Sequence, residues 1–445
     1  MSSVNTGTKT AKYTHEGAKA KNISLKQELR RSVTACLLWE DTFYEDRKAV
    51  AERIKDLVHH LPGEFVSELA IEAREKMKLR HVPLLLVREL ARHPKKDERK
   101  YVSDTLFRVI QRPDELTEYV AIYWKDGKEP LSAQSKLGLA KAFLKFNEYS
   151  FSKYNRDGQV KLRDVLFLSH PKPKTATQVD LFKKITDNTL TTPDTWEVAL
   201  SGGADKKETF TRLLEEEKLG ALALLRNLRN MSESGVRKDL ITDAISKMDV
   251  SRVLPFRFIS AAKYAPQFES ILEKSMFKAL ESQPELTGKT VILIDNSGSM
   301  YGSPVSAKSE IDRSDAACAL AILLREICEN VDIVAFSGRP TLLPSRHGFA
   351  LRDAIKATEH GGTYTETAKQ FADKLGYDRL IIVTDEQSHQ SLSNPLPGSK
   401  AYVVNVATYQ NGIGYGNYLH IDGFSEAIVD YIQASEDKSE ITEGD

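Results

Sequence analysis

The residues around position 290 constrain the fold of this chain most strongly. Residues 291–294 (Val-Ile-Leu-Ile) form an unbroken apolar run, which is typical of a strand covered on both faces. Similar runs follow at 331–336, 380–383 and 401–406. Helical segments are expected between and after them, at about 306–329, 351–358, 366–375 and 425–433. This alternation predicts a doubly wound α/β domain with a mostly parallel sheet.

The residues before this point have a different pattern. From about 23 to 280, apolar residues recur at helical spacing, as Leu29, Val33 and Leu37 do. Turn residues separate the helices at Pro62-Gly63, 155–158 and Gly202-Gly203. A long succession of helices with almost no strand signal predicts stacked helical pairs, as in an α-solenoid. An irregular helical bundle is the alternative.

The charge of the chain changes sign at the same boundary. The chain has 63 Lys and Arg and 63 Asp and Glu, so its formal net charge is 0. Residues 1–290 carry 51 basic and 41 acidic side chains, a net charge of +10, whereas residues 291–445 carry 12 and 22, a net charge of −10. Such asymmetry often marks a half that binds a polyanion, although two solvated faces would give the same totals.

Composition and charge together suggest four segments and a cytoplasmic protein. We expect a polar tail at 1–20, a helical domain at 21–286, an α/β domain at 287–435 and an acidic tail at 436–445. No apolar run approaches the roughly 20 residues of a membrane span, and the first residues lack the apolar block of a secretory signal. The 3 cysteines form no CxxC motif, which fits a reducing compartment.

Oxygen-bearing side chains follow two of the predicted strands. Asp295, Ser297 and Ser299 read D-x-S-x-S directly after the first strand, Asp385 leaves the end of strand 380–383, and Thr363 follows two glycines in a loop. Ligands of doubly wound sheets bind beyond the carboxyl ends of the strands, so these side chains are expected at one rim. Carboxylate and hydroxyl oxygens suit a hard divalent cation, and one Mg²⁺ is the expected ion. A serine-rich turn with a helix cap is the alternative, but it would not require Thr363 or Asp385.

The sequence shows no arrangement typical of an enzyme. We find no Ser–His–Asp or Cys–His arrangement that the surrounding sequence supports, no Walker loop and no GxGxxG motif. His389 lies four residues after Asp385 and could serve as the base of a metal-dependent hydrolase, but a loop histidine near an acid is usually polar surface. We therefore expect a protein without catalytic activity.

A cluster of cations in the helical half is a candidate site for RNA. Cations beside a histidine and hydroxyls can hold phosphates and stack on unpaired bases, although a solvated face is the simpler explanation. The candidate residues are Lys153, Arg156, Lys161, Arg163, His170 and Lys172. A second candidate is Arg226-Asn227-Leu228-Arg229-Asn230, for which a structural network inside the solenoid is the alternative.

Several of these stretches resemble known families. The D-x-S-x-S motif with Thr363 and Asp385 is similar to the metal-ion-dependent adhesion site of the von Willebrand factor A fold. Residues 163–173 (RDVLFLSHPKP) and 223–228 (ALLRNL) resemble the K-D-L-L-x-L-S-H-x-K-P and A-L-L-R-N-L stretches of the Ro autoantigen family, the TROVE domain proteins. Further stretches follow in the order of that family, namely Pro255-Phe256, 334–337 (VAFS), Gly361-Gly362-Thr363, Val383-Thr384-Asp385 and Gly423-Phe424.

The resemblance to the Ro family has implications for fold, partners and function. It implies a ring of HEAT-like helical repeats joined to a von Willebrand A domain, with a positive hole for single-stranded 3′ ends of misfolded RNA. It also implies that Lys153, Arg156, His170 and Lys172 lie in the region that binds a small non-coding Y RNA. The expected role is RNA quality control or stress response, and an exoribonuclease is a candidate partner. The alternative is a protein adaptor whose metal ion captures an acidic side chain of its partner.

Overall fold

The computed structural model describes most of the chain in two compact units. The described residues are 12–20, 23–34, 47–75, 79–155, 158–251, 253, 255–281, 283, 285–302, 311–406, 412–422, 428–429, 432 and 435–436. One unit consists of Met1–Arg47, Val250–Ser260 and Leu272–Asp445, and the other of Lys48–Asp249 and Ala261–Ile271. We call the first the α/β unit and the second the helical unit.

The helical unit contains helices α2 to α14, and parts of α15 and α16. Their bounds are α2 Arg47–His60, α3 Gly63–Glu75, α4 His81–Ala91, α5 Val102–Val109, α6 Pro113–Tyr123, α7 Ala133–Phe143, α8 Glu148–Tyr154, α9 Leu162–Ser169, α10 Ala176–Asp187, α11 Trp196–Ser201, α12 Lys206–Glu215, α13 Ala221–Glu233, α14 Lys238–Lys247, α15 Pro255–Tyr264 and α16 Glu269–Leu280. A 3₁₀ helix, η1, covers Lys96–Tyr101, and another, η2, covers Pro266–Phe268.

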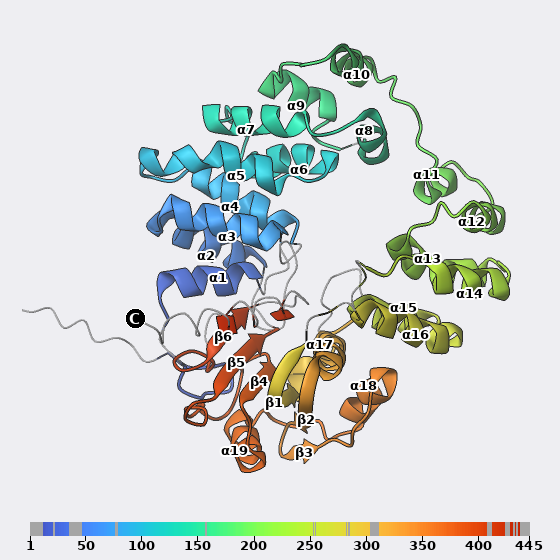
Figure 1. The fold of residues 1–445 in the computed structure, drawn as a ribbon. Helices are drawn as coiled ribbons and strands as arrows, with labels where there is room; N and C mark the ends of the chain where they lie inside the picture. The colour runs from blue at the N-terminus through green and yellow to red at the C-terminus, as the bar shows by residue number, and fades with distance from the viewer. Residues whose placement is uncertain are drawn as a thin grey trace, which may run out of the picture. The chain divides into compact units, whose positions relative to one another are not determined.

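These helices stack in the manner of a solenoid. Helix α5 packs against α3 and α7, α7 packs against α9, and α6 packs against α4 and α8, so alternate helices of the chain are neighbours (Figure 1). Helices α5 and α7 approach closely at Gly138, where an added Cβ would lie 2.9 Å from the carbonyl oxygen of Ser103. The predicted stacking of helical pairs is therefore confirmed, because each repeat buries its apolar face against the next one.

A buried ion pair also connects the layers of the helical unit. Arg74 on α3 donates to the Glu115 carboxylate on α6 at 2.7 Å, and it also donates to the carbonyl oxygen of Val109 at 2.9 Å. The same carboxylate accepts the backbone N–H groups of Gln111 and Arg112 and so caps α6. Each charge is thus matched by partners, as burial of an ion pair requires.

The α/β unit is built on a six-stranded sheet. The strand order is β3-β2-β1-β4-β5-β6, and all neighbours are parallel except the edge strand β3, which is antiparallel to β2. The strands are β1 Leu286–Asp295, β2 Cys328–Phe336, β3 Pro340–Leu342, β4 Arg379–Thr384, β5 Lys400–Asn405 and β6 Leu419–Asp422. The helices are α1 Leu25–Thr34, α17 Arg313–Ile327, α18 Gly348–Lys356 and α19 Thr365–Leu375, with a 3₁₀ turn, η3, at Gly298–Met300.

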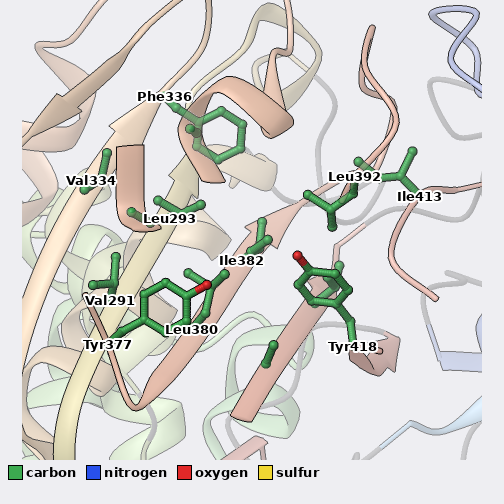
Figure 2. Packing of buried hydrophobic residues seen from close by; sticks show 14 residues of the cluster. Val291, Leu293, Val334, Phe336, Tyr377, Leu380, Ile382, Leu392, Ile413 and Tyr418 are labelled. Carbon is green, nitrogen blue, oxygen red and sulfur yellow. The ribbon is translucent and has the colours of Figure 1, made fainter. Parts of the chain in front are cut away.

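One hydrophobic cluster of this unit lies on the face of the sheet that α19 covers. Val291 and Leu293 of β1 point into it (Figure 2). Ala368 and Ala372 of α19 belong to the same cluster. Alternate residues of a strand point to opposite faces, so Ile292 and Ile294, which are also fully buried, face the other side. Helix α17 packs against β1, β2 and α18 and contributes no residue to this cluster. Helices therefore cover both faces, as the unbroken apolar run of β1 predicts.

The predicted fold class, helical repeats plus an α/β domain, is confirmed, with corrections in detail. The helix expected at 306–329 ends at Ile327, because the strand β2 already begins at Cys328, and residues 303–310 lie outside the described part. The short strands β3 and β6 were not predicted. The last predicted helix, 425–433, falls mostly outside the described residues. No helix in the described ranges is long and apolar enough to cross a bilayer.

Candidate metal centre and nucleic-acid interface

The D-x-S-x-S motif lies at the point where the strand order of the sheet reverses. Strand β1 has β2 on one side and β4 on the other, so its carboxyl end is the switch point at which such sheets bind ligands. Asp295 is the last residue of β1 and is 1% exposed. Its Oδ1 accepts the N–H of Ser297 at 2.9 Å, and its Oδ2 accepts the hydroxyl of Thr384 at 2.6 Å. The carboxylate is therefore fixed in orientation by the turn after β1 and by the end of β4.

The two serines of the motif converge in the turn after β1. Ser297 is buried, and its Oγ lies 3.2 Å from the Oγ of Ser299. The turn is joined to the glycine loop because the N–H of Gly298 donates to the carbonyl oxygen of Gly361 at 3.1 Å. Thr363, two residues further on, is also buried. The structure thus brings the serine turn and the Thr363 loop side by side.

Asp385 follows β4 and completes the predicted set. It is fully buried, and its Oδ1 accepts the N–H of Gln387 at 3.2 Å. The guanidinium of Arg313, at the start of α17, lies 3.8 Å from Oδ2 of Asp385 and also reaches the carbonyl oxygen of Ser299. The loop after Asp385 bonds to the Thr363 loop, since the Ser388 hydroxyl and the His389 N–H both donate to the carbonyl oxygen of Thr363.

The electrostatics of this cluster suit a cation. Burial, followed by the nearby Asp385 carboxylate, raises the pKa of Asp295 to about 7. Two buried carboxylates that repel each other are stabilised by a positive charge between them. Among the described residues, no three His, Cys, Asp or Glu side chains form a group that could hold a metal, so hydroxyl oxygens would have to complete the shell. Two carboxylates with three hydroxyls are a donor set that fits Mg²⁺ or Mn²⁺.

His389 is already engaged by other protein groups. Its Nδ1 lies 3.2 Å from the carbonyl oxygen of Thr363, and its Nε2 lies 3.1 Å from the Glu16 carboxylate. Its ring stacks on Tyr364 with 5.1 Å between ring centroids. Both ring nitrogens therefore have partners within the protein.

Glu386 is a site residue that the sequence reasoning missed. Its buried carboxylate accepts the N–H of Gly414 at 2.6 Å, lies 2.7 Å from Nε2 of His420, and pairs with Arg31 at 2.5 Å. Burial alone would raise the pKa of Glu386, but Arg31 and His420 lower it to about 2. No pattern in the sequence joins Arg31 to Glu386, because 355 positions separate them and only the fold brings them together.

The predicted RNA-binding residues lie along helices α8 and α9 of the helical unit. Lys153 is in the last turn of α8, and Lys161 is the residue before α9. His170 ends α9 in a left-handed conformation with φ of 49°, and Lys172 follows it. These four side chains and Arg163 are exposed, and Arg156 lies outside the described residues.

The exposed side chains of α9 form one stripe. Arg163 and Phe167 are four residues apart, which places them on one face of α9, and the exposed His170 follows directly after the helix. Phe167 is 55% exposed, although a phenylalanine is usually buried. This aromatic ring between a guanidinium and an imidazole was not among the predicted site residues. Its signal in the sequence was only the i, i+4 spacing from Arg163.

The second candidate, on α13, divides into exposed and buried parts. Arg226 and Arg229 are exposed, and Arg229 pairs with Glu233 at 2.9 Å. Asn227 is buried and donates to the carbonyl oxygen of Ala223 at 2.9 Å. The asparagine therefore has the structural role weighed from the sequence, whereas the arginines lie at the surface.

The chain is similar to a known protein family and to a solved structure. The family model for the TROVE domain matches residues 188–316, which include the D-x-S-x-S motif. The crystal structure of the Ro (RSR) protein of Deinococcus radiodurans aligns with 92% of this chain and 99% of its own length, with a TM-score of 0.63 and 18% sequence identity. No curated protein sequence matches the chain.

The chain therefore carries a TROVE domain match and has the fold of a Ro protein. The segment that matches the TROVE domain begins at Asn188, beyond the α8–α9 surface, and runs through β1 into α17. The resemblance inferred from short stretches is therefore confirmed, and the likeness to the Deinococcus structure extends the same fold over nearly the whole chain.

Proposed function

We propose that this Ro-like protein is a non-catalytic RNA-binding protein that takes a small stem-loop RNA, of the Y RNA kind, on the α8–α9 surface. The observation that carries the proposal is the exposed pair Arg163 and Phe167 on one face of α9, with the exposed His170 and Lys172 directly after the helix. Cations release counterions from phosphates, and an exposed aromatic ring stacks on unpaired bases. Because α9 has 8 residues, the cations at its two ends are about 12 Å apart, the span of a few nucleotides.

The proposal extends to the ends of misfolded RNA and to a role in RNA quality control or stress. The net charge of +10 on residues 1–290 supports a polyanion as the partner of the helical unit. Single-stranded RNA would be selected by shape more than by base sequence. An exoribonuclease that consumes such ends is the protein partner this role would require, and the cytoplasm is the expected compartment.

Binding of a stem-loop RNA with a single-stranded 3′ tail tests the proposal. We expect a mobility shift at low salt that weakens steeply as salt rises, and a weaker shift for His170→Ser and for Lys172→Ala. The matched control is Lys207→Ala, an exposed lysine on α12. Melting temperatures should be unchanged in all three variants. Absence of binding at low salt would contradict the RNA proposal, and an unchanged shift in both patch variants would place the interface elsewhere.

For the metal centre we propose one divalent cation, most simply Mg²⁺, held by Asp295, Ser297, Ser299, Thr363 and Asp385. The arrangement has the donor set of a von Willebrand A adhesion site, in which the ion would supply a Lewis-acidic position for an outside carboxylate or phosphate. Ser299 is only partly buried and Tyr364, next to Thr363, is 38% exposed. This open rim favours the alternative function, a protein adaptor that captures an acidic partner, as the second candidate.

We propose that this cation does not cleave RNA. The support is the environment of His389, whose two ring nitrogens are held by Thr363 and Glu16. A labelled RNA incubated with the protein and Mg²⁺ should therefore stay intact. Cleavage by the wild type that disappears in Asp385→Ala would show a metal-dependent hydrolase instead.

A further inference from the structure

A turn near the N-terminus docks on the loop that follows Asp385. The turn is closed by the Thr14 hydroxyl, which accepts the N–H of Ala18 at 3.0 Å. The same hydroxyl donates to the carbonyl oxygen of Ser388 at 3.0 Å, and Thr14 is buried. The next backbone N–H, that of His15, donates to the Gln387 side chain at 2.7 Å. This turn therefore makes direct hydrogen bonds to two consecutive residues of the loop.

Helix α1 holds the beginning of the same loop through a buried charge. The guanidinium of Arg31, 1% exposed, pairs with the Glu386 carboxylate, 0% exposed, at 2.5 Å. The fold leaves room for this pair at Gly412 and Gly414, where an added Cβ would collide with Arg31 and with Glu386 respectively. The buried charges are thus accommodated by the backbone of a third segment, and none of the three segments is close to another in the sequence.

The loop that these contacts hold determines the position of two of the proposed cation ligands. Glu386 follows Asp385 directly and has a φ of 60°, a conformation that residues with side chains rarely adopt and that surrounding contacts must maintain. Two residues further on, the Ser388 hydroxyl donates to the carbonyl oxygen of Thr363 at 3.1 Å. A change in the loop would therefore displace both Asp385 and Thr363.

We propose that Arg31 and Thr14 are positioning residues of the cation site, which hold loop 386–389 in the shape that presents Asp385 and Thr363 to the ion. This inference rests on the cation site proposed above. Partners that orient metal ligands from outside the coordination shell commonly change metal affinity by 10- to 100-fold when they are removed. Because linkage is reciprocal, a bound cation would in turn stabilise the docked N-terminal turn.

Titration of the full-length protein with Mn²⁺ tests the proposal. The electron paramagnetic resonance signal of free Mn²⁺ reports how much of the ion is bound. We expect the Kd to rise about ten-fold in Arg31→Met and about three-fold in Thr14→Val, which loses one hydrogen-bonding group. Arg31→Lys, which keeps the charge, should lose less affinity than Arg31→Met. Lys26→Met, an exposed cation on the same helix α1, is the matched control and should bind as the wild type does. Asp385→Asn should abolish binding.

Two further measurements separate positioning from simple stability. Thermal unfolding in EDTA shows which variants are folded at the assay temperature, and if Arg31→Met is not, Thr14→Val decides the question. Hydrogen exchange in residues 12–20 should slow when Mn²⁺ is added to the wild type, but not when it is added to Asp385→Asn. A purely structural role would lower the melting temperature and leave the Kd for Mn²⁺ unchanged.

The outcomes distinguish this inference from the cation site itself. If the wild type binds Mn²⁺, Asp385→Asn does not, and both Arg31→Met and Thr14→Val bind with the wild-type Kd, the inference is overturned and the cation site stands. If the wild type does not bind Mn²⁺, or Asp385→Asn binds equally well, the cation site fails and the inference fails with it.

Discussion

The two candidate sites of this protein are assembled in opposite ways. The candidate RNA surface consists of Arg163 and Phe167 on α9 and His170 at its end, which lie within eight positions of one another, so local structure sets their placement. The cation cluster combines residues from β1, the Thr363 loop and the end of β4, and its surroundings include Arg31 from α1. The first site is local and solvated, whereas the second is long-range and buried.

This difference determines how each site should respond to mutation. A solvated side chain on α9 can be removed without leaving a buried polar group, so its loss should affect binding and not stability. A buried charge in the cation cluster has partners that remain behind when it is removed, and those partners then lack compensation. Substitutions there should change stability and ligand affinity together.

Glu386→Gln should have the largest effect on the free energy of unfolding. A small effect would contradict the difference between the buried and the solvated site. The change leaves the buried Arg31 guanidinium without its counter-charge, so we expect the free energy of unfolding to fall by about 3 kcal/mol. The control is Glu233→Gln, which removes an exposed pair with Arg229 on α13 and should cost less than about 0.5 kcal/mol. Urea unfolding of both variants in EDTA measures the difference. Equal effects would contradict the distinction between the two regions.

Asp295→Asn should have the next largest effect, and its sign depends on the cation. The fold raises the pKa of Asp295 from 3.8 to about 7, so the folded protein resists ionisation of this carboxyl group. The folded state therefore loses stability as the pH rises from 3.8 to 7, and the full loss is present at pH 8. In EDTA at pH 8 the asparagine variant should therefore be more stable than the wild type.

Addition of Mg²⁺ should reverse that order. The wild type gains stability by binding the ion, whereas the variant lacks one of the two carboxylates and should gain little. Urea unfolding with and without Mg²⁺ gives both values. A variant that is markedly less stable than the wild type in EDTA would show that the two carboxylates do not repel each other as described.

Phe167→Ala should have the smallest of these effects and sharpens the description of the α9 stripe. Loss of a stacking ring should weaken binding of a stem-loop RNA with an unpaired tail about ten-fold. Leu137→Ala removes a side chain of α7 that is 48% exposed and should leave RNA affinity unchanged. Fluorescence anisotropy measures the affinities, and neither variant should change the melting temperature. A similar loss in both variants would point to a general effect of surface apolar area.

The sequence predicted the features that depend on local patterns. The apolar run 291–294 indicated a strand covered on both faces, and Asp295 and Asp385 were expected at one rim because both follow parallel strands; the structure has this topology. The helix after the motif was predicted too long, because the apolar residues near Cys328 fit a helix and a strand equally well. The edge strands β3 and β6 have only 3 and 4 residues, which is too short for an alternation of apolar and polar side chains to be recognised.

The partners of the cation cluster could not be predicted in the same way. Arg31 lies in a segment that the sequence shows only as an amphipathic helix, and nothing local indicates that its guanidinium is buried against Glu386. In the sequence, Glu386 is simply the acidic residue that follows Asp385, and nothing indicates that its carboxylate is buried. Contacts between segments hundreds of residues apart depend on the whole fold, which a single sequence does not display. The division into four segments and the metal and RNA ligands themselves stay predictions.

The central claim is that α9 and the loop after it bind RNA through cations and a stacking ring. The salt dependence of RNA affinity tests this claim most directly. Anisotropy of a labelled stem-loop RNA with a 3′ tail would be measured at several salt concentrations for the wild type and for the triple variant Arg163→Ala, Phe167→Ala, Lys172→Ala. We predict steep salt dependence in the wild type and a weaker affinity in the variant, with a log–log slope smaller by about 2 because two phosphate contacts are lost. Equal affinities and equal slopes for the two proteins would contradict the account.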